Sequence, residues 1–255
     1  MMPPVHVDGI GLWAPGFRDL AAWRAGQADP AVVEPSATLL TEALRRRASG
    51  LTRMAAEVAA QAVGQAGASQ VDVPLVLGSA LGEIACAAGI IGSFGDPGGL
   101  PSPTRFHNSV HNTAVGYLSI ATGNRLGATA LAAGAATTAM ALVEAATQLA
   151  ERGAAVVLML ADERLPPTLQ EWGTYQSAAV AFHLTAEPTA RTVARLTGLR
   201  RGPAAAPALP AGWRDHPCAG GLALAAAIGS ARGGPCGLGP WGDESWIVDL
   251  AAVPS

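Results

Sequence analysis

The chain has 255 residues, of which half are hydrophobic and 14% are charged, so it can form a large buried core. Its net charge of −3 and its pI near 5.9 give no reason to expect binding to nucleic acid or to an anionic membrane surface. All sixteen residues counted as lysine or arginine are arginines, which excludes chemistry through a lysine Schiff base or a lysine general base.

The cysteines and the apolar segments indicate in which cellular compartment the protein is expected. Cys86, Cys218 and Cys236 are widely spaced and form no Cys-x-x-Cys pair, so neither a disulfide framework nor a zinc site is expected. Residues 1–8 lack the basic and apolar regions of a signal peptide, and we expect a cytoplasmic protein. The long apolar run at residues 128–149 contains four threonines, a glutamine and a glutamate. It predicts a helix buried between two sheets rather than a membrane span.

Along the chain, strand-like and helix-like segments alternate, which is typical of an α/β domain. We predict strands at 5–11, 73–78, 128–132, 154–160, 178–184, 192–199 and 246–250, helices at 39–67, 81–91, 113–122, 135–152 and 221–230, a turn at 12–16, and loops at 92–103 and 202–221. The strands at 178–184 and 192–199 should pair as a hairpin, because only a short turn separates them. Gly9-x-Gly11 lacks the third glycine of a dinucleotide-binding fingerprint and indicates a turn.

Three groups of side chains could carry chemistry, and each also has a structural explanation. His107 and His111 have a spacing that suits metal binding on a helix, but the segment opens with Ser-Pro, which favours a loop in which they bond backbone groups. Cys86 lies among small apolar residues and is expected to be a buried, inert thiol. Asp162 and Glu163 end a strand and could act as acid and base, but we favour structural carboxylates that cap a helix or bond loop backbone.

Four segments in order resemble the N-terminal half of β-ketoacyl synthases, which have a thiolase-like fold. They are the opening strand and turn at 5–16, the strand and glycine turn at 75–82, the loop and helix from 102 to 123, and the strand at 154–163 with its acidic end. Specifically, the chain resembles the short ketosynthase-like proteins of aryl polyene pigment clusters, whose role is that of a chain-length factor. The resemblance implies a single domain over residues 1–255, with a mixed sheet of about five strands covered by helices on both faces.

The resemblance also locates the position of the nucleophile. Active ketosynthases carry a cysteine at the start of a buried helix, and here that position holds Ala135, counting from Gly123, or Ala136, counting back from Gly153. Their histidine pair lies in a C-terminal half that this sequence does not reach. The resemblance therefore implies a subunit that is not catalytic by itself and has no cofactor or metal. It would pair with an active β-ketoacyl synthase and shape the acyl-chain pocket.

Two surfaces are implied as contacts. The interface with the ketosynthase would include Asn112, Thr113, Val115, Gly116, Tyr117 and Ile120. An acyl carrier protein, which is acidic, could bind the basic stripe Arg45, Arg46, Arg47 and Arg53, although a solvated helix face also accounts for that stripe. Three alternatives remain: an acyltransferase with an unrecognised nucleophile, a scaffold that only stabilises its partner, and an unrelated α/β protein of similar composition.

Overall fold

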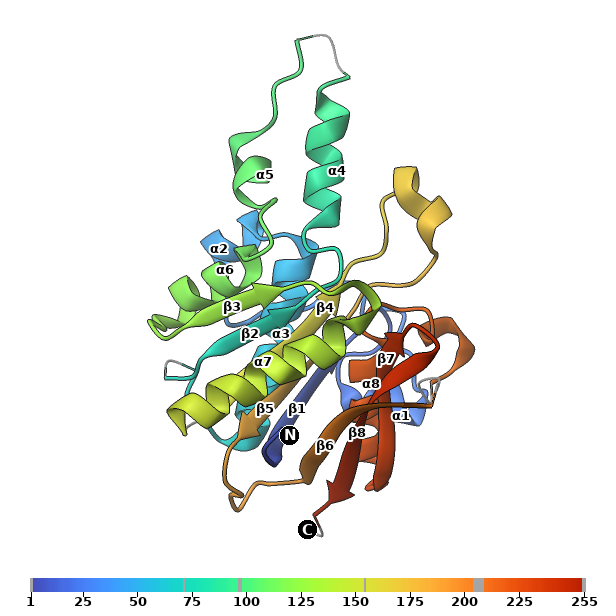
Figure 1. Ribbon diagram of the computed structural model, residues 1–255. Coiled ribbons are helices and arrows are strands. Elements are labelled where there is room, and N and C mark those ends of the chain that lie inside the picture. The colour runs from blue at the N-terminus through green and yellow to red at the C-terminus, as the bar shows by residue number, and fades with distance from the viewer. Residues whose placement is uncertain (1, 71, 96–97, 154, 204–208, 254–255) are drawn as a thin grey trace.

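The computed structural model describes residues 2–70, 72–95, 98–153, 155–203 and 209–253, and its strands form one mixed sheet (Figure 1). The eight strands have the order β3-β2-β4-β5-β1-β6-β8-β7. β2 is parallel to β3 and β4, and every other neighbouring pair is antiparallel. The strands are β1 (Val5–Trp13), β2 (Leu75–Gly78), β3 (Ala128–Leu131), β4 (Ala155–Asp162), β5 (Ala178–Thr185), β6 (Ala194–Pro203), β7 (Gly234–Trp241) and β8 (Glu244–Ala252).

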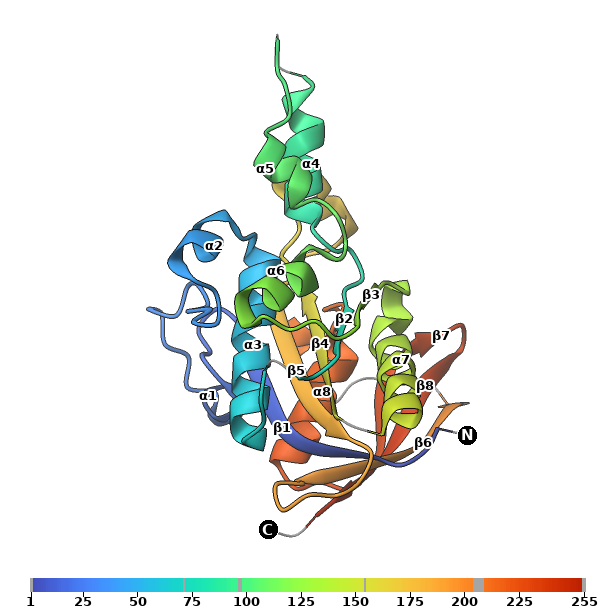
Figure 2. The same cartoon turned by 90° about the vertical axis from the view of Figure 1, so that its left-hand side faces the viewer.

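Helices cover both faces of the sheet, as predicted. α3 and α6 pack on one face, and α7 and α8 pack on the other (Figure 2). The α-helices are α1 (Leu20–Ala25), α2 (Glu42–Arg47), α3 (Gly50–Ala66), α4 (Ile84–Ser93), α5 (Pro103–His107), α6 (Thr113–Thr122), α7 (Thr137–Arg152) and α8 (Ala219–Gly229), and the short 3-10 helices are η1 (Gly134–Ala136), η2 (Pro167–Trp172) and η3 (Ala211–Trp213). No helix of the described residues is long and apolar enough to cross a membrane.

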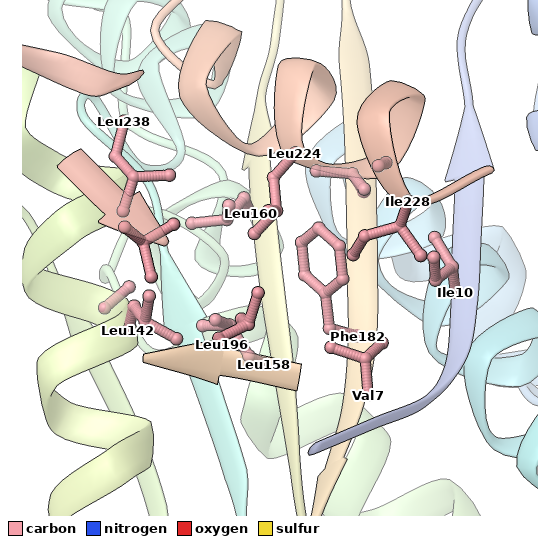
Figure 3. Packing of buried hydrophobic residues seen from close by; sticks show 14 of the residues in the cluster. Val7, Ile10, Leu142, Leu158, Leu160, Phe182, Leu196, Leu224, Ile228 and Leu238 are labelled. Atoms are coloured by element: carbon pink, nitrogen blue, oxygen red, sulfur yellow. The ribbon is translucent and has the colours of Figure 1, made fainter. Parts of the chain in front are cut away.

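The position of β4 inside the sheet, between β2 and β5, explains why its sequence is continuously apolar. Successive side chains of a strand point to opposite faces, and both faces of β4 are covered. Leu158 and Leu160 belong to the core beneath α7 and α8, whereas Met159 belongs to the core beneath α3. Figure 3 shows Leu160 beside Leu224 of α8, with Phe182 of β5 next to them.

The Gly9-x-Gly11 pattern is a packing motif inside β1 and not a turn. A Cβ on Gly9 would overlap the carbonyl oxygen of Ala62, and one on Gly11 would overlap that of Val58. The two glycines therefore let α3 lie directly against the strand backbone. The β1 strand continues to Trp13, beyond the predicted boundary at residue 11.

The predicted hairpin at 178–199 is wrong. β5 and β6 do not pair with each other, because β1 lies between them and is antiparallel to both. A hairpin turn and a connection that passes one intervening strand look alike in sequence, since both need only a short polar segment between two apolar ones.

The sheet and helix boundaries differ from the predictions in four further ways. The sheet has eight strands instead of about five, and β7 was not predicted at all. The helix expected at 39–67 is divided into α2 and α3, and the side chain of Ser49 caps α3. α7 contacts β2, β4 and β7 of one sheet and does not lie between two sheets. The predicted loop at 202–221 contains η3 and the start of α8.

Parts of three predicted elements cannot be compared with the structure. Residues 96–97 and 204–208 of the predicted loops, and Ala154 of a predicted strand, lie outside the described residues.

Candidate functional site at the carboxyl ends of the parallel strands

β3, β2 and β4 run parallel, so their carboxyl ends meet at one end of the sheet. In open α/β sheets this is the usual place for a ligand or catalytic site. The first turn of α7 packs here against Gly78, the last residue of β2. A Cβ on Gly78 would lie 2.8 Å from the Leu160 side chain and 2.9 Å from that of Ala141. Glycine is therefore needed for α7 to begin so close to the strand ends.

The predicted nucleophile position lies in η1, which leads directly into α7. Ala135 is exposed, whereas Ala136 is buried. β7 crosses this turn: a Cβ on Gly239 would overlap the carbonyl oxygen of Ala135, and the φ of 139° at Gly239 also favours glycine. The β7 backbone thus covers one side of the helix start. Neither alanine supplies a nucleophilic atom.

Two threonine hydroxyls follow the alanines. Thr137 Oγ1 accepts a hydrogen bond of 3.0 Å from the backbone N–H of Ala133 and donates one of 2.7 Å to the carbonyl of Gly134. It therefore acts as a cap for the turn. Thr138 Oγ1 is buried and has no hydrogen-bond partner among the described residues. In the described part of the chain, neither hydroxyl contacts a side chain that could remove its proton.

The Asp162 carboxylate joins the end of β4 to the turn after β2. It accepts hydrogen bonds of 2.9 Å from Ser79 Oγ and of 3.1 Å from the backbone N–H groups of both Ala80 and Leu81. Burial raises the pKa of this carboxyl above its usual value, although these hydrogen bonds favour the charged form. The prediction that the acidic pair bonds loop backbone is confirmed for Asp162.

Cys218 and His216 also reach this cluster, although no sequence pattern indicated a role for either residue at a site. Cys218 Sγ donates to Asp162 Oδ2 at 3.3 Å, and the Cys218 backbone N–H donates to His216 Nδ1 at 2.9 Å. Burial and the neighbouring Asp162 raise the pKa of the Cys218 thiol well above 9, and burial lowers the pKa of His216 to about 4. A buried thiol next to a carboxylate stays protonated, so this Cys-His-Asp set is not an activated nucleophile.

Two further carboxylates, the buried Glu83 and the partly buried Glu163, lie beside the first turn of α3. Glu163 Oε1 accepts from the backbone N–H of Leu51 at 3.0 Å, which confirms the structural prediction for the second member of the acidic pair. Glu83 Oε1 accepts from Ser49 Oγ at 2.8 Å and from Thr52 Oγ1 at 3.1 Å. Burial, and to a lesser degree the charge of Glu163, raise the pKa of Glu83 to about 7. These contacts tie the segment before α4 to the body of the molecule.

Cys86 lies in the first turn of α4 and is partly buried, not fully buried as predicted. Burial and the nearby Glu83 raise the pKa of its thiol to about 12. The thiol is therefore protonated at neutral pH, in agreement with the expected lack of reactivity.

A two-helix arm, defined as residues 83–95 and 98–110, projects beyond the carboxyl end of the sheet (Figures 1 and 2). It contains α4 and α5, and no residue of either helix is buried. Large apolar side chains are exposed along it, and Leu100 reaches 87% exposure. The others are Ile91, Phe94, Phe106 and Val110. An apolar surface of this extent on a slender projection is typical of a region that contacts another molecule.

His107 and His111 lie where the arm returns to the body. His107 ends the short helix α5, so the loop prediction is wrong at this residue, and its ring lies 6.2 Å from that of Tyr117. His111 packs against Gly82, leaving no room for a Cβ there, and its Nε2 is buried without a partner among the described residues. The expected bonds from these rings to backbone are not found in the described structure.

Residues 20–210 match the family of the β-ketoacyl synthase N-terminal domain. The chain belongs to this family. No curated protein sequence matches it. The assignment of the family's nucleophile position to Ala135 or Ala136, in η1 immediately before α7, stays a prediction.

Solved ketosynthase structures have the same fold. A chain of the complex of the ketosynthase ApeO with its chain length factor ApeC from Xenorhabdus doucetiae is 22% identical, with a TM-score of 0.71 over 96% of this chain and 98% of that one. The ishigamide ketosynthase/chain length factor is 15% identical, with a TM-score of 0.76 over 99% and 100%. A chain of the type II polyketide synthase complex AntDE:AntF, an acyl carrier protein with its ketosynthase, is 12% identical to this chain. Its TM-score is 0.77, and the match covers 98% of this chain and 100% of that one. The thiolase-like fold is thereby confirmed.

The predicted interface helix of this β-ketoacyl synthase family member is α6, and only part of it is accessible. Thr113, Val115 and Tyr117 are buried in the chain's own core, so in this conformation they cannot contact a partner. Asn112 and Ile120 are exposed and Gly116 is partly exposed; Ile120 has 70% of its surface accessible. The list of interface candidates on α6 is therefore reduced to Asn112, Gly116 and Ile120.

Most arginines of the basic stripe at α2 and α3 form ion pairs or hydrogen bonds within the chain. Arg46 pairs with Glu42 at 2.7 Å, Arg53 pairs with Glu34 at 3.1 Å, and Arg45 donates to the carbonyl of Ser36 at 2.9 Å. Arg47 is exposed. Binding of an acyl carrier protein at this stripe stays a prediction.

Proposed function

We propose that this chain is a non-catalytic ketosynthase-like subunit of the chain-length-factor type, which pairs with an active β-ketoacyl synthase and shapes its acyl pocket. The proposal treats residues 1–255 as one domain, with an acyl carrier protein as a second, transient partner. It requires no cofactor or metal and places the protein in the cytoplasm.

The observation that carries the proposal is the chemistry of the first turn of α7. A condensing enzyme needs a thiolate at this helix start, where backbone N–H groups and the helix dipole stabilise charge. Here the turn offers two methyl groups, at Ala135 and Ala136, and two threonines. Thr137 caps the turn, and Thr138 lacks a base within the described residues. A fold of this family without an acylated residue is suited to a supporting subunit.

Three exposed features support a protein partner. The arm presents apolar side chains, and α6 presents the exposed Ile120. β3 is the terminal strand of the described sheet, so one side of its backbone is open to another strand. A partner that covers these features would bury apolar surface of the kind found at stable interfaces. The complexes named above, each of a ketosynthase with a chain length factor or carrier protein, are consistent with such an assembly.

The test is co-purification with an active β-ketoacyl synthase. The wild-type chain should co-elute with it as a one-to-one complex. Gly116→Arg should abolish co-elution, because a Cβ at Gly116 meets no described atom within 4 Å and the monomer can accept the side chain, whereas an interface cannot accept an unpaired charge.

Ala25→Arg is the matched control, since Ala25 is also exposed on a helix but lies on α1, away from α6 and β3. It should leave co-elution unchanged. If the wild-type chain does not co-elute with a ketosynthase, or if Gly116→Arg co-elutes as well as wild type, this interface is wrong.

A further inference from the structure

A polar cluster lies beside the open edge of β3. Gln148 Nε2 donates to Glu144 Oε1 at 2.8 Å and to Thr129 Oγ1 at 3.1 Å, and Thr129 Oγ1 donates to Glu144 Oε1 at 3.2 Å. Thr129 belongs to β3, and the other two residues belong to α7. Gln148 Oε1 is buried and lacks a partner in the described structure. The cluster thus places a carboxylate, which only accepts hydrogen bonds, at the edge strand.

The open edge could in principle pair with the same edge of a second copy. A twofold axis perpendicular to the sheet would keep the faces matched, because paired residues of antiparallel strands point to the same side. Thr129 would then lie opposite its own counterpart if the axis passes through Thr129, or diagonal to it if the axis passes through Ala130. The two Cβ atoms would be about 5 Å apart in the first case and about 7 Å in the second.

Either register would bring two Glu144 carboxylates together, since each is hydrogen-bonded to its own Thr129. Like charges repel strongly at an interface that excludes water. Arg152 is a cation on this side of the chain, and its guanidinium would lie 3.3 Å from a Cβ on Gly127, two residues before Thr129. In both registers Arg152 therefore lies further along the edge than Glu144.

We infer that Glu144 disfavours pairing of β3 with a second copy and selects a partner strand edge that presents a hydrogen-bond donor or a cation opposite it. The inference rests on β3 being the interface of the proposed function. It assigns to one side chain the choice between self-association and association with a different chain, a common use of charge in specificity.

The test is a charge exchange at this position, followed by sedimentation velocity over a range of protein concentrations. Glu144→Gln keeps the acceptor oxygen and removes the charge, so it should self-associate about tenfold more tightly than wild type, or more. Glu144→Lys alone should stay monomeric, because its charges also repel. An equimolar mixture of wild type and Glu144→Lys should form one-to-one pairs that high salt dissociates.

Glu187→Gln is the control, since it removes an equal charge from an exposed residue in the connection between β5 and β6. It should sediment as wild type does. Equal self-association of wild type and Glu144→Gln, or failure of the charge-exchanged mixture to pair, would overturn the inference. Weaker self-association of Glu144→Gln would overturn it too, because Glu144 would then be bonding Arg152 of the other copy. These results do not depend on a ketosynthase, so they are distinct from failure of co-purification.

Discussion

The Ser79 hydroxyl donates a 2.9 Å hydrogen bond to the buried carboxylate of Asp162 and in turn accepts one of 2.9 Å from the backbone N–H of Gly82. The end of β4 thus fixes the turn after β2, from which the arm rises. The described part of the arm is therefore attached to a turn that is hydrogen-bonded inside the protein.

Asp162→Asn should destabilise the protein by about 2–4 kcal/mol. Both carboxylate oxygens accept from backbone N–H groups, so an amide must turn its own donor toward Ala80 or Leu81. Urea unfolding measures the change, with the exposed Asp243→Asn as control. Equal stability of Asp162→Asn and wild type would mean that the turn does not depend on this carboxylate.

Glu83→Gln should change how stability depends on pH. The folded pKa of about 7 lies above the usual 4.5, so the stability contributed by proton binding is complete below pH 4.5 and is lost as pH rises through 7. The variant should match wild type near pH 4 and exceed it near pH 8 by at most about 3 kcal/mol. Urea unfolding at both pH values checks this, with Glu42→Gln as the control for loss of an exposed carboxyl. A constant difference at all pH values would refute the titration of Glu83.

Thr137→Val should destabilise the protein and Thr138→Val should not, although the residues are neighbours. Thr137 loses two hydrogen bonds and leaves the Ala133 N–H without its acceptor, which costs about 1–3 kcal/mol. The Thr138 hydroxyl has no partner in the described structure, so an isosteric methyl should be neutral or stabilising. Thermal unfolding of the two variants gives the comparison. A clear loss of stability in Thr138→Val would reveal a hidden hydrogen bond.

Ala135→Cys and Ala136→Cys should not create a ketosynthase. Catalytic residues that act as a unit do not contribute additively, and a thiol alone does not supply the histidine pair of the family. Ala135→Cys should still react with iodoacetamide faster than Ala136→Cys, because residue 135 is exposed and residue 136 is buried. Wild type gives the background from its own cysteines. Malonyl-dependent chain extension by either purified variant alone would show that a working catalytic set had been overlooked.

Sequence patterns predicted the elements that pack tightly against the sheet. β4 and α7 have strong apolar patterns, and each was predicted to within about two residues of its observed bounds. β7 was missed because five of its eight residues are glycine or proline, as in a loop, and only its pairing with β8 and its contact with η1 make it a strand.

The candidate site was only partly predictable. The family resemblance predicts the nucleophile position just before α7, which stays a prediction, and the acidic pair Asp162 and Glu163 was correctly assigned to backbone bonding. Cys218 was not connected to Asp162 because 56 residues separate them and no local pattern links them. Burial of Val115 also could not be read from α6, since its apolar residues do not gather on one face strongly enough to separate core from interface.

The most direct test of the central claim is the intact mass of both subunits, after the purified complex with an active β-ketoacyl synthase is incubated with an acyl donor and quenched before condensation. The account predicts one acyl group on the ketosynthase and an unmodified mass for this chain, because Ala135 and Ala136 have no nucleophile and the described hydroxyls of Thr137 and Thr138 have no base. An acyl adduct on this chain, at either threonine or at any cysteine, would contradict the account and make the chain a catalyst.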